Sequence, residues 1–212
     1  MSAALFPRGV PKSKRLFDLA LTIPGALLIS PFVGILALLI RWRLGAPVLF
    51  TQLRPGLRSQ GFRLHKFRTM TDARDDLGRL LPDDLRLTRL GRFLRSFSLD
   101  ELPELYNVMR GEMSLVGPRP LLMAYLERYT PHQARRHEIL PGMTGWAQVN
   151  GRNAITWEQK FDLDVWYVDH WSLALDVKIL AMTLLKAARR EGISPPGKTS
   201  ADEFMGLRGG PE

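Results

Sequence analysis

The chain has 212 residues, a length that suits one domain with a buried core. Its 30 Lys and Arg residues outnumber its 21 Asp and Glu residues, and the net charge of +9 predicts an anionic partner: nucleic acid, phospholipid headgroups or a phosphorylated substrate. The absence of cysteine excludes disulfides, thiolate chemistry and a Cys-based zinc site. The four histidines show no metal-ligand spacing, which argues against a His-ligated transition metal.

Residues 19–40 form an uncharged apolar segment between basic flanks. As one helix the segment would be about 33 Å long, enough to cross a bilayer core. Basic residues stand at positions 12, 14 and 15 before it and at 41 and 43 after it, so the positive-inside bias keeps both ends in the cytoplasm. Pro31 would break the helix, and Ser30 can hydrogen-bond a freed backbone group. We expect a re-entrant helix-break-helix, with a spanning helix as the alternative and a cleaved signal peptide disfavoured.

Two short strands are predicted over residues 47–52 and 62–67, joined as a hairpin by turn residues. Residues 71–87 are highly charged, which predicts a solvated helix or loop, with a metal site as a less favoured alternative. Residues 88–97 repeat apolar side chains at helical spacing. Arginines at positions 86, 89, 92 and 95 therefore lead up to the acidic residues that follow.

Two adjacent carboxylates, Asp100 and Glu101, fall at the predicted start of a helix over residues 99–110 that ends at Gly111. Ser98 stands three residues before Glu101 and matches a capping box, so helix capping alone would explain this stretch. The functional alternative is a nucleophile. A carboxylate near a helix N-terminus and among arginines is expected to stay ionised, as a nucleophile must.

Two later stretches could contact phosphate. Arg119 stands between Pro118 and Pro120 in a stiff loop that would aim its guanidinium at a phosphate, although a structural turn is an equal alternative. Residues 121–139 suggest a helix interrupted near Thr130-Pro131, and residues 141–152 a polar loop whose glycines let backbone N–H groups approach a phosphate. Neither a Walker nor a Rossmann fingerprint is present.

The C-terminal part predicts an amphipathic helix from Ser172 to about Arg190 that suits a surface of anionic lipid. The aromatic residues at positions 157, 166, 167 and 171 belong either to a headgroup-level belt or to the core. The tail over residues 193–212 is expected to be disordered.

Several sequence blocks, in order, resemble the bacterial sugar transferase family, the monotopic phosphoglycosyl transferases that start glycan assembly on a polyprenol phosphate. The resemblance covers residues 12–192, after an N-terminal tail of residues 1–11. Its blocks are KRLFD at 14–18, KFRTM at 66–70, SLDELP at 98–103, MSLVGPRP at 113–120 and PGMTG at 141–145, which runs on to Gly151-Arg152. Glu104 and Glu112 depart from the family pattern, in which Gln and Asp are commoner.

The resemblance implies an α+β, mainly helical fold. A re-entrant membrane segment with its break at Ser30-Pro31, a small β-hairpin and interfacial amphipathic helices would surround a catalytic site on the cytosolic face. The family's nucleophile maps to Asp100 and its Mg²⁺-binding glutamate to Glu101. The implied substrate-binding and phosphate-binding residues are Arg95, Arg119, Pro118, Pro120, Lys66, Arg68, Gln148 and Arg152.

The implied reaction has two steps. Asp100 would attack the sugar-bearing phosphorus of a nucleoside diphosphate sugar, expected to be a UDP-sugar, and undecaprenyl phosphate would then take the phosphosugar. This would be the first membrane step of exopolysaccharide, O-antigen or glycoconjugate assembly at the bacterial inner membrane. The chain, without the N-terminal membrane bundle of larger relatives, resembles the minimal catalytic form, and a homodimer is left open.

Two alternatives compete with this reaction. One is a basic, membrane-anchored nucleic-acid-binding protein, for which the sequence offers charge and no recognisable motif. The other is an inactive scaffold with the same fold. The sequence does not identify the sugar.

Overall fold

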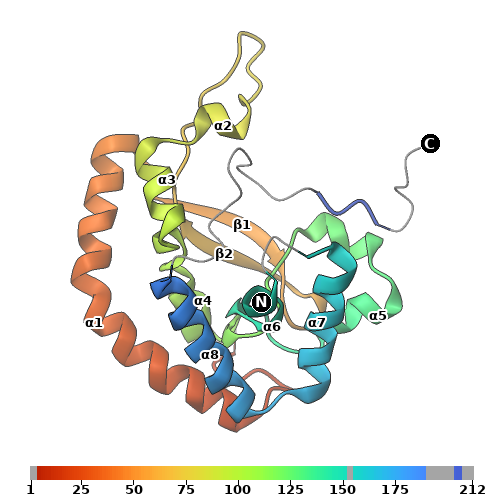
Figure 1. Cartoon of the computed structure of the whole chain (residues 1–212). Coiled ribbons are helices and arrows are strands. Elements are labelled where there is room, and N and C mark those ends of the chain that lie inside the picture. Colours follow the sequence, from red (N-terminus) through yellow and green to blue (C-terminus); the bar gives the residue numbers. More distant parts are fainter. Residues whose placement is uncertain (1–3, 152–154, 190–202, 207–212) are drawn as a thin grey trace.

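A computed structural model describes residues 4–151, 155–189 and 203–206 (Figure 1). Helices dominate and two small sheets lie among them, so the predicted mainly helical α+β class is confirmed. The α-helices are α1 (Lys12–Leu44), α2 (Asp83–Arg86), α3 (Arg89–Ser96), α4 (Glu104–Arg110), α5 (Pro131–Ala134), α6 (Trp146–Asn150), α7 (Trp157–His170) and α8 (Leu173–Ala188). The 3₁₀ helices are η1 (Leu57–Ser59), η2 (Leu99–Glu101), η3 (Met123–Arg128) and η4 (Arg135–His137). The strands are β1 (Leu49–Pro55), β2 (Gly61–Phe67), β3 (Ser114–Val116) and β4 (Gly142–Thr144).

Helix α1 exposes apolar side chains and buries polar ones, the reverse of a surface helix in a soluble protein. Lys14 and Asp18 have no exposed surface, whereas Leu28 is 83% and Trp42 76% exposed. Among the described residues, α1 is also the helix long and apolar enough to cross a membrane. An apolar surface of this extent is unfavourable in water and marks a membrane or protein contact.

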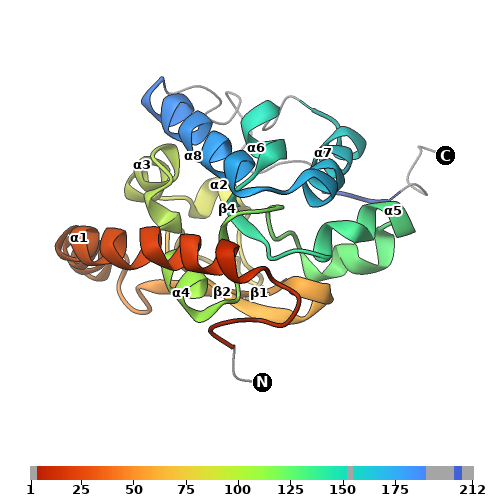
Figure 2. The ribbon, with the colours of Figure 1, turned by 90° about the horizontal axis from the view of Figure 1, so that it is seen from below.

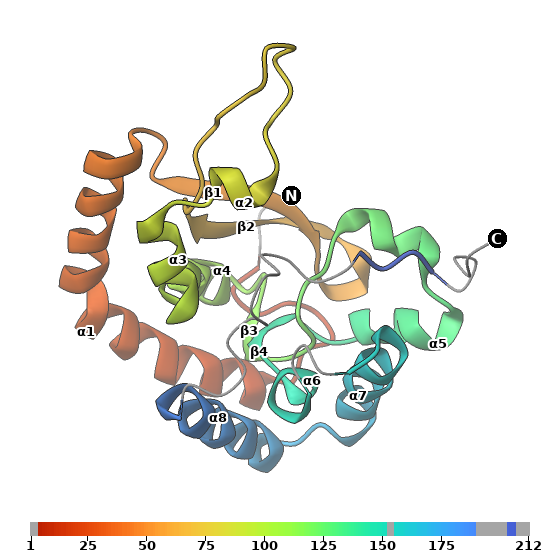
Figure 3. The same cartoon turned by 45° about the horizontal axis from the view of Figure 1, so that its top comes forward.

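Helix α1 bends near its middle, as Figures 1 and 3 show, and it stays helical from Lys12 to Leu44. Pro31 has no N–H to give to the carbonyl four residues earlier, which belongs to Leu27. The Ser30 hydroxyl donates to that carbonyl at 2.8 Å. The expected role of Ser30 is confirmed, whereas the expected interruption is a bend in one continuous helix.

Both halves of α1 contact the same folded body. In the first half, Lys14 forms an ion pair with Asp176 of α8, and Asp18 accepts a hydrogen bond from the Ser114 hydroxyl of β3. These contacts account for Lys14 and Asp18 of the block at 14–18. The second half of α1 packs into a buried apolar cluster with β2 and α3, formed by Leu36, Ile40, Phe67 and Leu94.

Strands β1 and β2 pair antiparallel with Leu49 opposite Phe67, so the predicted hairpin is confirmed. The charged segment between β2 and α3 projects from the body as a long loop that carries the short helix α2 (Figure 3). Helix α3 confirms the helix predicted over 88–97. Its N-cap is Thr88, whose side chain accepts from the Gly91 N–H at 2.9 Å.

Two predicted segments differ in the structure. Residues 141–152 contain β4 and α6 in place of a long loop, and β4 pairs parallel with β3. A strand of three residues is too short to show an alternating pattern in the sequence. Its partner, β3, is also distant along the chain. The predicted helix over residues 121–139 is the series η3, α5 and η4; its break falls at Thr130, which begins α5 with a capping box to Gln133.

Helices α5 and α7 lie on the side of the body away from α1 (Figure 2). Here an aromatic cluster packs Trp157 and Phe161 of α7 against Tyr125 and Phe204. Tyr167 is also buried, at 1% exposure, which favours the core interpretation for much of the aromatic group. Helix α8 confirms the predicted C-terminal helix. Of the predicted disordered tail, only residues 203–206 are described, and Phe204 is 3% exposed there.

Candidate active site

Asp100 and Glu101 lie in η2, a single 3₁₀ turn between α3 and α4. The expected capping box is wrong. Ser98 adopts a left-handed backbone with φ 54°, and its side chain makes no capping hydrogen bond. Instead the Glu101 N–H donates to the backbone carbonyl of Ser98 at 3.2 Å. The two carboxylates therefore sit in a tight turn ahead of α4 and not in the first turn of one long helix.

The Glu101 carboxylate lies between two cations. Lys66, from β2, is 2.6 Å from its Oε1, and Arg119 reaches it with both terminal nitrogens. Burial acts to raise the pKa of Glu101, but the charges of Arg119 and Lys66 dominate and lower that pKa to about 2. Glu101 is thus an anion at any physiological pH, and its charge in turn raises the pKa of Arg119.

A third carboxylate, Glu104, shares Lys66 with Glu101. The Lys66 ammonium is 3.1 Å from Glu104 Oε1, and the Glu104 side chain is 3% exposed. Burial and the nearby charge of Glu101 raise the pKa of Glu104 to about 7. Sequence reasoning missed this residue as part of the site, although its departure from the family pattern marked the position.

Asp100 is buried beside these groups, with 8% of its surface exposed. Burial raises the pKa of Asp100, and the charge of Glu101 raises it further, against the opposing charges of Lys66, Arg95 and Arg119. The expected effect of nearby cations is present in Lys66, Arg95 and Arg119, but burial and Glu101 outweigh it. Desolvation was omitted from that argument, and a desolvated carboxylate that does ionise is poorly shielded by water.

The loop over residues 117–120 buries both prolines and leaves Arg119 partly accessible, with 43% of its side chain exposed. Two other arginines donate hydrogen bonds to its backbone carbonyls. Arg136 donates to the Arg119 carbonyl at 2.7 Å and forms a fully buried ion pair with Asp164 of α7. Arg54 of β1 donates to the Pro120 carbonyl at 3.5 Å. These contacts fix the direction in which Arg119 points.

Glycines in this region serve close packing of the backbone. The Gly117 N–H donates to the Thr144 carbonyl at 2.8 Å, and the Gly142 N–H donates to the Pro118 carbonyl at 3.0 Å. A Cβ at Gly142 would lie 2.0 Å from the Gly117 nitrogen. These two N–H groups are consequently used within the fold, which differs from the predicted phosphate-binding loop.

Of the remaining candidates, Arg95 contacts Thr69 at 3.1 Å and lies close enough to influence the Asp100 charge. Arg68 does not join the site, because its guanidinium contacts Asp72 and the carbonyls of Leu44 and Ala46. Gln148 lies on α6, where its amide donates to the Met143 carbonyl at 3.4 Å. Arg152 lies outside the described residues.

Arg54 is a second residue that sequence reasoning missed. Its guanidinium is partly buried near Arg119, and both burial and the Arg119 charge lower its pKa. Its Nε is buried and has no hydrogen-bond partner. No local motif marks this arginine, because β1 brings it to the site only through the hairpin.

The donor set suits Mg²⁺ that shares its coordination with a substrate. Mg²⁺ prefers carboxylate oxygens and is commonly held by one or two carboxylates together with phosphates and water. Glu101 offers such an oxygen, with 16% of its side chain exposed. Within the described ranges, no group of three or more His, Cys, Asp or Glu side chains forms a self-sufficient metal site. That finding includes the charged segment 71–87, the less favoured candidate.

The site therefore combines a buried carboxylate, a permanently charged neighbouring carboxylate and two cations on separate elements. Such an arrangement can bind a phosphorylated ligand through Arg119 and Lys66 while holding a nucleophilic oxygen near it. The longest helix of the same protein, α1, exposes an apolar surface. Together these features suit an enzyme that acts on a phosphorylated ligand beside a membrane.

A family model described as bacterial sugar transferase matches residues 10–190. The chain belongs to the bacterial sugar transferase family and is a transferase. A relative in Bacillus subtilis (strain 168), named "Uncharacterized sugar transferase EpsL", is 56% identical over 193 residues, covering 91% of this chain and 96% of that protein. The family resemblance predicted from the sequence blocks is confirmed.

Longer relatives carry names that state a reaction. The undecaprenyl-phosphate glucose phosphotransferase of Komagataeibacter xylinus is 42% identical over 189 residues, covering 81% of this chain and 35% of that protein. The UDP-glucose:undecaprenyl-phosphate glucose-1-phosphate transferase of Escherichia coli (strain K12) is 38% identical over 183 residues, covering 82% of this chain and 39% of that protein. The chain thus spans nearly all of EpsL and less than half of these two relatives.

Proposed function

We propose that the protein transfers a sugar-1-phosphate from a UDP-sugar to undecaprenyl phosphate. The observation that carries this proposal is the placement of Asp100 and Glu101 in one tight turn with Arg119 and Lys66 on Glu101. The names of the longer relatives supply the class of donor and acceptor. The sugar itself, and the glycan that it starts, are left open.

In the first step, an Asp100 carboxylate oxygen attacks the sugar-bearing phosphorus. The new P–O bond replaces the bond to the leaving phosphate, and UMP departs with that electron pair. In the second step, a phosphate oxygen of undecaprenyl phosphate attacks the same phosphorus and releases the Asp100 carboxylate. The products are UMP and undecaprenyl diphosphate sugar, and the protein returns to its starting state.

The surrounding residues support both steps. Arg119 can contact phosphate oxygens through its planar fork, and Lys66 adds a second positive charge. The burial of Asp100 limits its hydration, so the carboxylate, once ionised, is less shielded by water when it attacks. Glu101 would hold Mg²⁺, which when bound supplies charge neutralisation at the diphosphate.

We place the active site at the cytoplasmic face of the bacterial inner membrane, with α1 re-entrant. Both halves of α1 contact one folded body, through Lys14 and Asp176 at one end and through the cluster around Ile40 at the other. A straight spanning helix would put these ends on opposite sides of the bilayer. Cysteines introduced at Leu5 and Met205 should both resist a periplasmic thiol reagent, and labelling at one of them would instead indicate a spanning helix.

The reaction is tested with purified protein in nanodiscs, UDP-sugars, undecaprenyl phosphate and Mg²⁺. Wild-type protein should release UMP and, without acceptor, should gain a phosphosugar mass on a peptide that contains Asp100. Asp100→Asn should lose both signals, whereas the matched control Asp84→Asn, on the exposed helix α2, should keep them. An adduct that persists in Asp100→Asn refutes the aspartate intermediate. Absence of UMP release from wild-type protein with every donor supports the scaffold alternative.

A further inference from the structure

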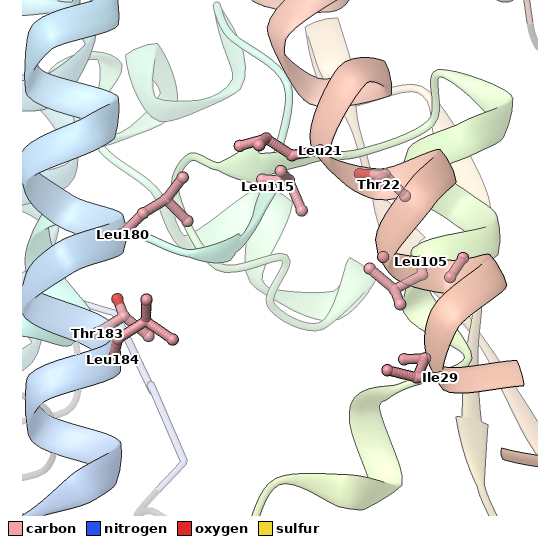
Figure 4. A pocket seen from close by; sticks show the side chains of 10 residues that line it. Leu21, Thr22, Ile29, Leu105, Leu115, Leu180, Thr183 and Leu184 are labelled. Carbon is pink, nitrogen blue, oxygen red and sulfur yellow. The ribbon is translucent and has the colours of Figure 1, made fainter. Parts of the chain in front are cut away.

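An apolar groove opens between α1 and α8. Its volume is about 330 Å³. Figure 4 shows leucine side chains from α8 facing side chains of α1 across the gap, with β3 and α4 behind them. The apolar side chains that line it include Leu21, Ile29, Leu105, Leu115, Leu180 and Leu184.

The α1 wall of the groove is thin because Gly25 and Ala26 form part of it. A Cβ built on Gly25 would meet no atom within 4 Å, so the space is not filled by a neighbouring side chain. On the opposite wall, Leu184 is 71% exposed. An open apolar groove is unfavourable in water, and an apolar ligand would remove that cost.

The groove is continuous with the apolar exposed surface of α1. Leu21 and Ile29 line the groove, while Leu27 and Leu28, on the same stretch of helix, are 70% and 83% exposed. A chain that lies along this surface can therefore enter the groove from the lipid phase without crossing water. The volume corresponds to roughly ten water molecules, room for a few isoprene units and not for a protein helix.

One lining residue of the groove belongs to the helix that follows the two carboxylates. Leu105 belongs to α4, the helix that directly follows the turn carrying Asp100 and Glu101. Its backbone N–H donates to Leu102, one residue after that turn, at 3.2 Å. A ligand with an apolar chain in the groove and an anionic head beyond Leu105 would meet the positive charges around Asp100, which include Arg95 and Lys66.

We propose that the groove between α1 and α8 binds the polyisoprenyl chain of the acceptor lipid phosphate, close to its phosphate end. The inference rests on the proposed function, because it assigns a binding site to the second substrate of that reaction. The donor has no apolar chain and does not use the groove. Filling the groove should consequently impair the second step and leave the first unchanged.

Two glycines of α1 provide a matched pair for this test. Gly25 lines the groove and Gly34 does not, and a Cβ at either position meets no atom within 4 Å. Gly25→Leu places a side chain in the groove, and Gly34→Leu makes the same change on an open surface. Ala26 also lines the groove, so Ala26→Leu serves as a second filling variant if Gly25→Leu unfolds.

Each variant is assayed in nanodiscs for both half-reactions. Without acceptor, all variants should form the phosphosugar adduct at the wild-type rate. With undecaprenyl phosphate, Gly25→Leu should lose at least about tenfold in kcat/KM for the acceptor, equivalent to ~1.4 kcal/mol, and Gly34→Leu should not. A short-chain, water-soluble isoprenyl phosphate should be affected less than the full-length lipid, since it fills less of the groove.

The failures can be told apart. If wild-type protein forms no adduct, the proposed function fails and the groove is not at issue. If adducts form and Gly25→Leu and Gly34→Leu transfer equally well, the groove does not bind the acceptor chain. A third outcome concerns bulk lipid. If Gly25→Leu keeps its acceptor kinetics but its thermal stability changes with the phospholipid chain length of the nanodisc, the groove holds bulk lipid, and the proposal is overturned.

Discussion

Lys14 Nζ lies 2.8 Å from Asp176 Oδ2, and neither side chain has any exposed surface. This ion pair joins the first turn of α1 to α8, and Tyr167 and Trp171 also donate hydrogen bonds to Asp176. The pair therefore fixes the angle at which the apolar helix leaves the folded body. It also sets the separation of the two walls of the groove described above.

Removal of one partner from this pair should destabilise the protein strongly. Lys14→Met leaves the Asp176 carboxylate buried without its counter-charge, for which the expected loss is about 3–5 kcal/mol. Thermal unfolding in detergent should show a clear fall in Tm. The double variant Lys14→Met with Asp176→Leu should recover part of the loss, because no unpaired charge remains. If the double variant is as unstable as the sum of the single variants, the unpaired charge is not the cause.

Arg119→Lys tests whether the shape of the guanidinium matters beyond its charge. Both terminal nitrogens of Arg119 reach Glu101, and a lysine cannot reproduce that fork. We expect kcat for UMP release to fall roughly 10–100-fold while the fold is retained. Arg79→Lys is the control, since Arg79 is 72% exposed on the projecting segment and forms an ion pair with Asp75 there. Equal activities of the two variants would contradict a role for the fork.

Local patterns predicted the elements that have strong local signals. The hairpin, α3 and α8 follow from alternation or helical spacing, and Ser30 caps the carbonyl that Pro31 leaves free. Adjacent residues also placed Asp100 and Glu101 together, because they share one turn whatever the remainder of the chain does.

Long-range packing explains what the sequence did not reveal. The pairing of β3 with β4 depends on glycines that allow the backbone of Gly117 to pass within hydrogen-bonding distance of Thr144. Arg54 reaches the site through β1, and no local motif marks it. The raised pKa of Asp100 follows from burial, which a list of neighbouring charges along the sequence cannot supply.

Gly91→Ala should displace α3 from the segment that precedes it. A Cβ at Gly91 would lie 2.0 Å from the Thr69 carbonyl oxygen, which is backbone and cannot rotate away. The expected cost is about 1–3 kcal/mol in stability, with reduced activity because Arg95 contacts Thr69 on the same interface. Gly34→Ala is the control, since a Cβ there meets nothing within 4 Å. A Gly91→Ala protein with wild-type Tm and activity would show that the two segments separate without cost.

Glu104→Gln tests the titration of the third carboxylate. Because the folded-state pKa of Glu104 is raised from 4.5 to about 7, the folded protein binds this proton more tightly than the unfolded chain does. The stabilising effect of that proton is fully present below pH 4.5 and is lost as the pH rises through about 7.

Glutamine is neutral at every pH and does not lose that contribution. We therefore expect the unfolding free energy of Glu104→Gln, relative to wild type, to rise by on the order of 1–3 kcal/mol when the pH is raised from 5 to 8 in metal-free buffer. Tm measured at both pH values checks this, and Glu138→Gln, at an exposed site, should show no such trend. A stability difference between Glu104→Gln and wild type that does not change with pH would mean that Glu104 stays ionised, held by Lys66.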